Sequence, residues 1–314
     1  MDKLEILKSL GEKFDLPIFY QDIWFESFDP DSWDLVLSGE VNDPKAVWPF
    51  MKKKKMGFTK ITQAWLNPYG GPWLFYPKGQ KDYARMSFEK KVIDELYGAL
   101  PKHDAIACNL YPSLQNHLPF KWLGFEQTTQ YTYLLDLKLT EEELREGLNG
   151  NIRREINKAT RNKIDIVESD ELEDLHRLKI LDYEQKGMPI GYSFEDFEKR
   201  FRPILIAGKA KVLYALQDGK RVSGILLLWD KHQAYYLVGA TDPNTKGNGI
   251  FSFLLFQAIL EAQKHVDTFN FEGSVIEAIE KFFRSFGSRQ QPYHVLSKYQ
   301  NKKLKALDQL RKGQ

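Results

Sequence analysis

A glutamate at the end of an apolar strand is the residue of this sequence best placed for chemistry. Residues 269–274 read Phe-Asn-Phe-Glu-Gly-Ser, so one face of a predicted strand is apolar and the other presents Asn270 and Glu272. The apolar residues that follow recur at intervals of three and four and predict a helix: Ile276, Ile279, Phe283 and Phe286. Because α/β proteins hold ligands at such junctions, Glu272 is a candidate catalytic carboxylate. A solvated carboxylate, or one that caps the helix, would show the same pattern.

Other reaction types find little support in the sequence. The six histidines show no His-Glu-x-x-His spacing, and no Gly-x-Ser-x-Gly elbow is present, which disfavours metal hydrolases and serine hydrolases. The single cysteine, Cys108, lies in an apolar run and is interpreted as a buried structural thiol. No metal is therefore expected.

The chain length and the net charge limit which classes of protein are possible. A chain of 314 residues exceeds the usual limit of one hydrophobic core and favours two domains. The 45 basic and 43 acidic side chains leave a net charge of +2, which gives no general signal for nucleic-acid binding. The amino terminus lacks the apolar core of a signal peptide, and no segment is apolar enough to span a membrane. We expect a soluble cytoplasmic protein.

The first predicted domain covers residues 1–139. Its expected strands are 33–37, 46–51, 58–61, 105–110 and 131–137. Ser87 is the expected N-cap of a helix that runs to about Leu100. The four lysines at 52–55 are interpreted as a solvated hairpin turn, with an anion-binding patch as the alternative.

The second predicted domain covers residues 140–300, and residues 301–314 form a basic tail. Thr140 and Glu143 make a capping box for a helix that is expected to break near Asn149. Further helices are predicted at 171–185, 194–206 and 250–264, and strands at 211–217, 221–230, 233–240 and 293–299. Asp218 and Gly219 predict a tight hairpin turn. The order of elements repeats that of the first half, which predicts an α+β protein with two similar domains.

The motifs and their order resemble the GNAT superfamily of acyltransferases. The sequence looks most like its tandem branch, the Fem-type aminoacyl and peptidyl transferases and their bacterial relatives. The residues that carry this resemblance are 269–274 with Phe-Phe-Arg-Ser-Phe-Gly at 282–287, supported by 151–159, Trp-Pro-Phe at 48–50 and Pro-Tyr-Gly-Gly-Pro at 68–72. The resemblance spans about residues 33 to 299. It implies two GNAT-like domains, each a mostly antiparallel twisted sheet flanked by helices, of which the first is non-catalytic.

The resemblance also implies a phosphate-binding loop before the helix at 250–264. GNAT enzymes hold the CoA pyrophosphate on Gln/Arg-x-x-Gly-x-Gly/Ala, because glycines let backbone amides reach the phosphates. The corresponding residues are Asn244, Lys246, Gly247, Asn248 and Gly249, and asparagine stands where the family has Gln or Arg. Acetyl-CoA or another acyl-CoA is therefore one expected donor. Aminoacyl-tRNA, which many Fem-type relatives use, is the other.

The implied activity is transfer of an acyl or aminoacyl group to an amine acceptor. Glu272 is the expected base or amine-orienting group, and Tyr236 a second catalytic residue. Tyr235 and Tyr236 adjoin the acyl channel, but by strand alternation only one can point into it. Arg153, Arg154 and Arg284 are candidate ligands for an anionic acceptor, such as a peptide or a cell-wall or nucleotide-sugar precursor, with a solvated helix face as the alternative for the first two. The other interpretation is a non-catalytic nucleic-acid-binding or interaction protein with a retained GNAT fold.

Overall fold

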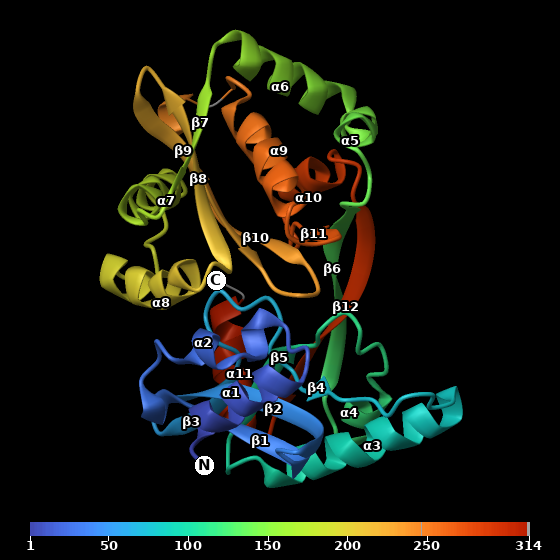
Figure 1. Ribbon diagram of the computed structural model, residues 1–314. Coiled ribbons are helices and arrows are strands. Elements are labelled where there is room, and N and C mark those ends of the chain that lie inside the picture. The colour runs from blue at the N-terminus through green and yellow to red at the C-terminus, as the bar shows by residue number, and fades with distance from the viewer. Residues whose placement is uncertain (246, 313–314) are drawn as a thin grey trace. The chain divides into compact units, whose positions relative to one another are not determined.

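The computed structural model describes residues 1–245 and 247–312 and shows a mixed α/β protein (Figure 1). The chain forms two compact units, unit 1 of Met1–Gln130 with Pro292–Gln314, and unit 2 of Tyr131–Gln291. The chain enters unit 2 along β6 (Glu126–Asp136) and leaves it along β12 (Arg289–Tyr299). This division falls after 130 and after 291, whereas the sequence placed its boundaries after 139 and 300. Both connecting strands are shared between units, which a linear pattern does not reveal.

Unit 1 is a sheet with helices packed on it. Its strands follow the order β1-β2-β3-β5-β12, and β4 pairs with β2. The strands are β1 (Trp33–Glu40), β2 (Asp43–Lys55), β3 (Phe58–Thr62), β4 (Trp73–Leu74) and β5 (Ala105–Asn109). The helices are α1 (Lys3–Lys13), α2 (Asp22–Phe25), α3 (Asp82–Ala99), α4 (Leu118–Trp122) and α11 (Lys302–Lys312). One core cluster joins Trp48 and Phe50 of β2 to Ile93 of α3 and Phe120 of α4.

Two local expectations for unit 1 are wrong. The lysines at 52–55 belong to β2 and pair with β3, and the turn consists of Met56 and Gly57 alone. Helix α3 begins at Asp82, and Ser87 lies inside it with its hydroxyl donating to the Tyr83 carbonyl, 3.1 Å away. In the first case β2 continues through the lysines by pairing with β3, and in the second the mostly exposed residues 82–87 already belong to the helix before the position predicted as its cap. Cys108 is buried, as expected.

Unit 2 is a sheet in the order β6-β11-β10-β9-β8-β7. The strands not yet given are β7 (Asp165–Ser169), β8 (Ala210–Gln217), β9 (Lys220–Trp229), β10 (Ala234–Thr241) and β11 (Thr268–Asn270). Only β10 and β11 run parallel, and the other neighbouring pairs for which registers are known are antiparallel. The sequence predicted the long strands but missed β7, which is short and only half-buried.

The helices of unit 2 begin at or close to the residues that the sequence indicated, with α7 starting at Glu173 instead of about residue 171. They are α5 (Glu141–Gly147), α6 (Gly150–Arg161), α7 (Glu173–Gln185), α8 (Phe194–Ile206), α9 (Ile250–Ala262) and α10 (Glu277–Arg284). The capping box of Thr140 and Glu143 starts α5, and Asn149 caps α6 after the expected break. Helices α5, α6, α9 and α10 share one core with the sheet, while α7 and α8 pack on its other side (Figure 1).

Within residues 1–245 and 247–312, no helix is long and apolar enough to cross a membrane.

Candidate functional site

Glu272 lies just beyond β11 in a strained backbone conformation. Its φ is +59°, in the left-handed region that bulky residues rarely adopt. Its amide donates to the Asn270 side-chain oxygen at 2.7 Å, and its carbonyl accepts from the Thr132 hydroxyl at 2.8 Å. Gly273 follows because a Cβ atom there would lie 1.9 Å from the Tyr131 carbonyl oxygen. Such strain persists only where neighbours fix it, and it is typical of functional positions.

A buried polar network holds Asn270 in place. Its side-chain nitrogen donates to Gln233 at 3.3 Å, and Gln233 donates to the Tyr235 hydroxyl at 3.0 Å. Tyr235 in turn donates to Asp230 at 3.2 Å. The structure therefore places Tyr235 in the core, fully buried, as part of the support beneath Glu272. The expectation that it lines the acyl channel is replaced by this supporting position.

Tyr236 lies where β10 and β11 stop pairing. The two strands are paired only at Ala234 with Phe269 and at Tyr235 with Asn270. β10 continues to Thr241 alongside β9, with a bulge directly after Tyr236. The Tyr236 ring lies over Gly239, where a Cβ atom would come within 2.4 Å of the tyrosine hydroxyl. By alternation Tyr235 and Tyr236 face opposite sides, and Tyr236 faces the opening between the strands.

The carboxyl of Glu272 and the hydroxyl of Tyr236 are electrostatically coupled. Burial raises the pKa of Glu272 well above its ordinary value, and its Oε1 has no hydrogen-bond partner among the described residues. Burial, and then the negative charges of Glu272 and Asp182, raise the pKa of Tyr236. Burial therefore favours the neutral form of Glu272 and the protonated hydroxyl of Tyr236.

A pocket of about 660 Å³ opens beside Tyr236. Its wall on α7 carries Lys179, Asp182 and Lys186, and Asp182 pairs with Lys186 at 2.7 Å. Burial lowers the pKa of Lys179, whose ammonium donates to the Gly239 carbonyl at 3.3 Å. Glu272 does not line this pocket. The pocket thus presents the Tyr236 hydroxyl, with charges of both signs beside it.

The loop before α9 forms another wall of the pocket. Gly247 and Gly249 have φ of +84° and +73°, and Gly249 is the N-cap of α9. Asn244 is exposed, and its side chain donates back to Asp242 at 3.0 Å. Asn248 is half-buried between the glycines, and Lys246 lies outside the described residues. Gly247 and Gly249 have the conformations typical of a phosphate-binding loop, but the side chain of Asn244 is hydrogen-bonded to Asp242 of the same segment.

A carboxylate from α6 lies at the first turn of α9. Glu155 accepts a hydrogen bond from the Ser252 hydroxyl, and both residues line the pocket. A Cβ atom at Gly249 would lie 2.2 Å from the Glu155 carbonyl oxygen, so α6 packs directly on the loop. A helix N-terminus attracts an anion, and here that anion is Glu155. These residues do not fit the diphosphate of an acyl-CoA, which Glu155 would repel.

The predicted arginines lie away from this pocket. Arg153 and Arg154 are exposed on α6, and Arg154 bonds to Asn151 of the same helix. Arg284 is exposed at the end of α10 and pairs with Glu280 at 3.1 Å. None of the three arginines lines the pocket.

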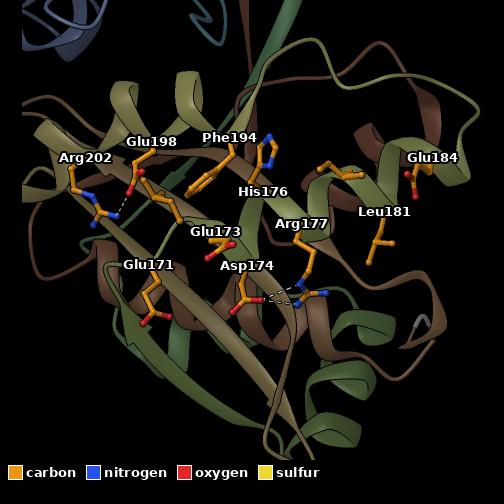
Figure 2. A pocket seen from close by; sticks show the side chains of 12 residues that line it. Glu171, Glu173, Asp174, His176, Arg177, Leu181, Glu184, Phe194, Glu198 and Arg202 are labelled. Atoms are coloured by element: carbon orange, nitrogen blue, oxygen red, sulfur yellow. Dashed lines mark hydrogen bonds and ion pairs between the residues drawn. The ribbon is translucent and has the colours of Figure 1, made fainter.

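A larger pocket, of about 730 Å³, lies between α7 and α8 (Figure 2). Ion pairs occupy its wall, with Arg177 and Asp174 at 2.9 Å and Arg202 and Glu198 at 2.7 Å. In the described part of the chain, no three His, Cys, Asp or Glu side chains cluster in a way that could hold a metal ion. The pocket at Tyr236 therefore remains the better candidate for acyl-transfer chemistry.

Residues 148–274 match the acetyltransferase (GNAT) domain family. The matched segment contains Tyr236, Glu272 and the loop before α9, and it lies within unit 2. No curated protein sequence matches the chain.

Solved structures extend the likeness beyond the GNAT domain. FemX is 12% identical over 94% of this chain and 96% of its own, with a TM-score of 0.65. The C-terminal domain of a putative lysylphosphatidylglycerol synthetase from Agrobacterium fabrum is 14% identical over 98% and 94%, with a TM-score of 0.60. A tandem GNAT protein from the clavulanic acid biosynthesis pathway is 9% identical over 95% and 94%, with a TM-score of 0.51. Likeness at these identities shows the fold alone, and the predicted tandem GNAT-like fold is confirmed.

Sequence reasoning missed four residues of the pocket. Lys179 and Asp182 lie three positions apart on α7, a spacing that places both on one helix face and was a usable signal. Glu155 and Ser252 come together from α6 and α9, which are far apart in the chain. No local sequence pattern indicates that Glu155 and Ser252 come together.

Proposed function

We propose that this protein transfers an aminoacyl group from an ester donor, such as aminoacyl-tRNA, to an amine acceptor. The GNAT domain supports acyl transfer in general. The observation that carries the finer proposal is the Glu155 carboxylate at the first turn of α9, where an acyl-CoA would need to place its diphosphate. The likeness to FemX and to a lysylphosphatidylglycerol synthetase agrees with an aminoacyl donor.

The pocket has the charges that an aminoacyl group needs. An aminoacyl ester carries a free ammonium, and Asp182 and Glu155 are the carboxylates of the pocket wall. Asp182 is mostly buried, with its side chain 15% exposed, and already pairs with Lys186, so a ligand ammonium would compete with Lys186 for Asp182 or pair with Glu155. An acetyl group has no charge to satisfy there.

Tyr236 and Glu272 are proposed to move the proton. As the acceptor amine attacks the ester carbonyl, its excess proton passes to the Glu272 carboxylate through the Tyr236 hydroxyl. The same path returns the proton to the departing ester oxygen. A base with a raised pKa suits this role, because proton transfer is most effective when the pKa lies near the working pH.

Unit 1 is proposed to be non-catalytic and to contribute to acceptor binding. Arg153, Arg154 and Arg284 stay candidates for the acceptor's anionic groups, since their exposed guanidinium groups are accessible from solvent. A peptide or a cell-wall or nucleotide-sugar precursor would supply both the amine and the anion. Charge reversal at Arg153 and Arg154 should weaken acceptor binding without affecting folding.

The donor is tested with tRNA charged with labelled amino acids. The protein should release label from tRNA in the presence of an amine acceptor, and the label should appear on the acceptor. Glu272→Gln should slow this transfer by a factor of about 10² to 10⁴. Glu277→Gln is the matched control, because Glu277 is an exposed carboxylate in the first turn of α10 that does not line the pocket.

Thermal unfolding in the presence of acetyl-CoA tests the proposal that the protein does not use CoA as its donor. No increase in the melting temperature is expected, since a ligand stabilises only the state that binds it. A clear increase would overturn the donor assignment. It would leave the roles of Tyr236 and Glu272 to be tested with acetyl-CoA as donor.

A further inference from the structure

The hairpin of β2 and β3 in unit 1 ends in an exposed methionine flanked by lysines. Met56 and Gly57 form the turn, with φ of +52° and +78°, and Met56 is 75% exposed. Lys53, Lys54 and Lys55 precede it on β2 and are exposed. The tip therefore presents an apolar side chain and three positive charges together.

The same turn occurs elsewhere in the chain with the expected residue. Asp218 and Gly219 join β8 to β9 with φ of +51° and +74°, which matches the geometry at Met56 and Gly57. Asp and Asn suit the first position of such a turn, and a long apolar side chain does not. Met56 thus fits the backbone conformation of the β2–β3 turn poorly, and its apolar side chain is unfavourably exposed to solvent. Single exposed apolar residues are ordinary, but not in this conformation.

Some lysines of this hairpin form an ion pair with a carboxylate, and others do not. Nearer the sheet, Lys52 pairs with Asp34 at 3.2 Å, and Lys60 of β3 pairs with Asp308 of α11. Lys53, Lys54 and Lys55 make no ion pair within residues 1–245 and 247–312. The charges within the sheet are thus neutralised, and those at the tip are open to an external anion.

More basic side chains border the foot of the hairpin. Thr59, the cross-strand partner of Lys54, donates from its amide to Asp104 at 2.8 Å. Asp104 lies in an open hollow whose wall also carries Lys102, Lys302 and Lys303. The positive surface therefore continues from the tip toward α11.

We propose that the β2–β3 tip docks unit 1 on an anionic phospholipid surface. The methionine would enter the interface between headgroups and acyl chains, and the lysines would contact the headgroup phosphates. Met56 favours an anionic membrane over RNA as the partner, because the phosphate backbone of RNA offers no apolar surface for the methionine side chain to contact. Weak, reversible binding is expected, since one methionine buries little apolar area.

Vesicle co-sedimentation of the full chain tests the proposal. Vesicles of phosphatidylcholine mixed with phosphatidylglycerol should bind the protein at low salt, and vesicles of phosphatidylcholine alone should not. Replacing Lys53, Lys54 and Lys55 together by Gln should weaken binding by a factor on the order of 100, at about tenfold or less per lysine. Met56→Asn should weaken it by about tenfold. Asn suits the turn, so this variant is expected to fold at least as stably as the wild type.

A control variant carries the same charge change elsewhere. It replaces three exposed lysines of unit 2 by Gln and should retain vesicle binding: Lys163, Lys199 and Lys220. Equal binding to both kinds of vesicle, or none to either, would overturn the proposal. So would binding that the lysine variant loses and Met56→Asn fully retains, or binding to tRNA without binding to the anionic vesicles. These readouts do not involve acyl transfer, so they are independent of the proposed function.

Discussion

Replacing Glu272 by glutamine should stabilise the protein, and more so as the pH rises. Glu272 has a buried Oε1 without a hydrogen-bond partner among the described residues, and burial raises its pKa well above the ordinary value of 4.5. The folded state therefore holds this proton at pH values where the unfolded chain has released it. Stability falls as pH rises from about 4.5 through the folded-state pKa, because a buried charge must then form. Glutamine keeps the shape and removes the charge.

The size of the effect follows from the unpartnered carboxylate. An unpaired buried polar group costs about 1–3 kcal/mol when neutral and more when charged, and glutamine, which keeps the unpaired oxygen, should recover about 1–3 kcal/mol of the part due to the charge. For a domain of this size that free energy corresponds to an increase of roughly 3–10 °C in melting temperature. The gain should be present at about pH 8 and nearly absent at about pH 4, where Glu272 is neutral in both states. The strained φ of +59° is the same in both proteins and cancels.

Circular dichroism melts of wild type and Glu272→Gln across this pH range measure the difference directly. Comparing the two proteins cancels every other titrating group except those coupled to Glu272, which are Tyr236 and, through it, Asp182. Glu184→Gln, at an exposed position of α7, is the control for a change of charge alone. The reasoning fails if the difference is the same at every pH, or if the glutamine variant is less stable at about pH 8. If the Glu272→Gln variant is more stable but transfers the aminoacyl group poorly, Glu272 is a residue retained for function at a cost in stability.

Three further outcomes follow from the packing. Burial would raise the pKa of Glu261, but hydrogen bonds from neighbouring cations lower it to about 2, so Glu261→Gln should cost about 1.5–3 kcal/mol at neutral pH. Urea titration at neutral pH and at about pH 3 should show this cost shrinking as pH falls below 4.5. Gly249→Ala should destabilise by about 2–4 kcal/mol in the same assay because its Cβ would meet the Glu155 carbonyl, while Gly98→Ala, with open space around it, should not. Burial raises the pKa of Cys108 to about 12, so a thiol reagent should modify it only at the rate of unfolding.

Much of the fold could be predicted because its signals are local. The capping boxes of α5 and α8, the Asp218–Gly219 turn and the long strands of unit 2 depend on residues a few positions apart. The failures at Ser87 and at residues 52–55 have the opposite cause. There, β2 continues through the lysines because it pairs with β3, and α3 begins at Asp82 with a mostly exposed first turn, so the local boundary signals did not hold.

The candidate site divides in the same way. The sequence by itself determined that a glutamate and a glycine follow an apolar strand, that two tyrosines lie on an adjacent strand, and that two glycines precede α9. Only the tertiary structure decided that Tyr236 faces the pocket while Tyr235 supports Glu272, because strand alternation does not say which face is covered. Only the fold brings Glu155 to the first turn of α9, since the contact joins residues 97 positions apart. The burial that raises the pKa of Glu272 likewise depends on packing from distant segments, which no local pattern encodes.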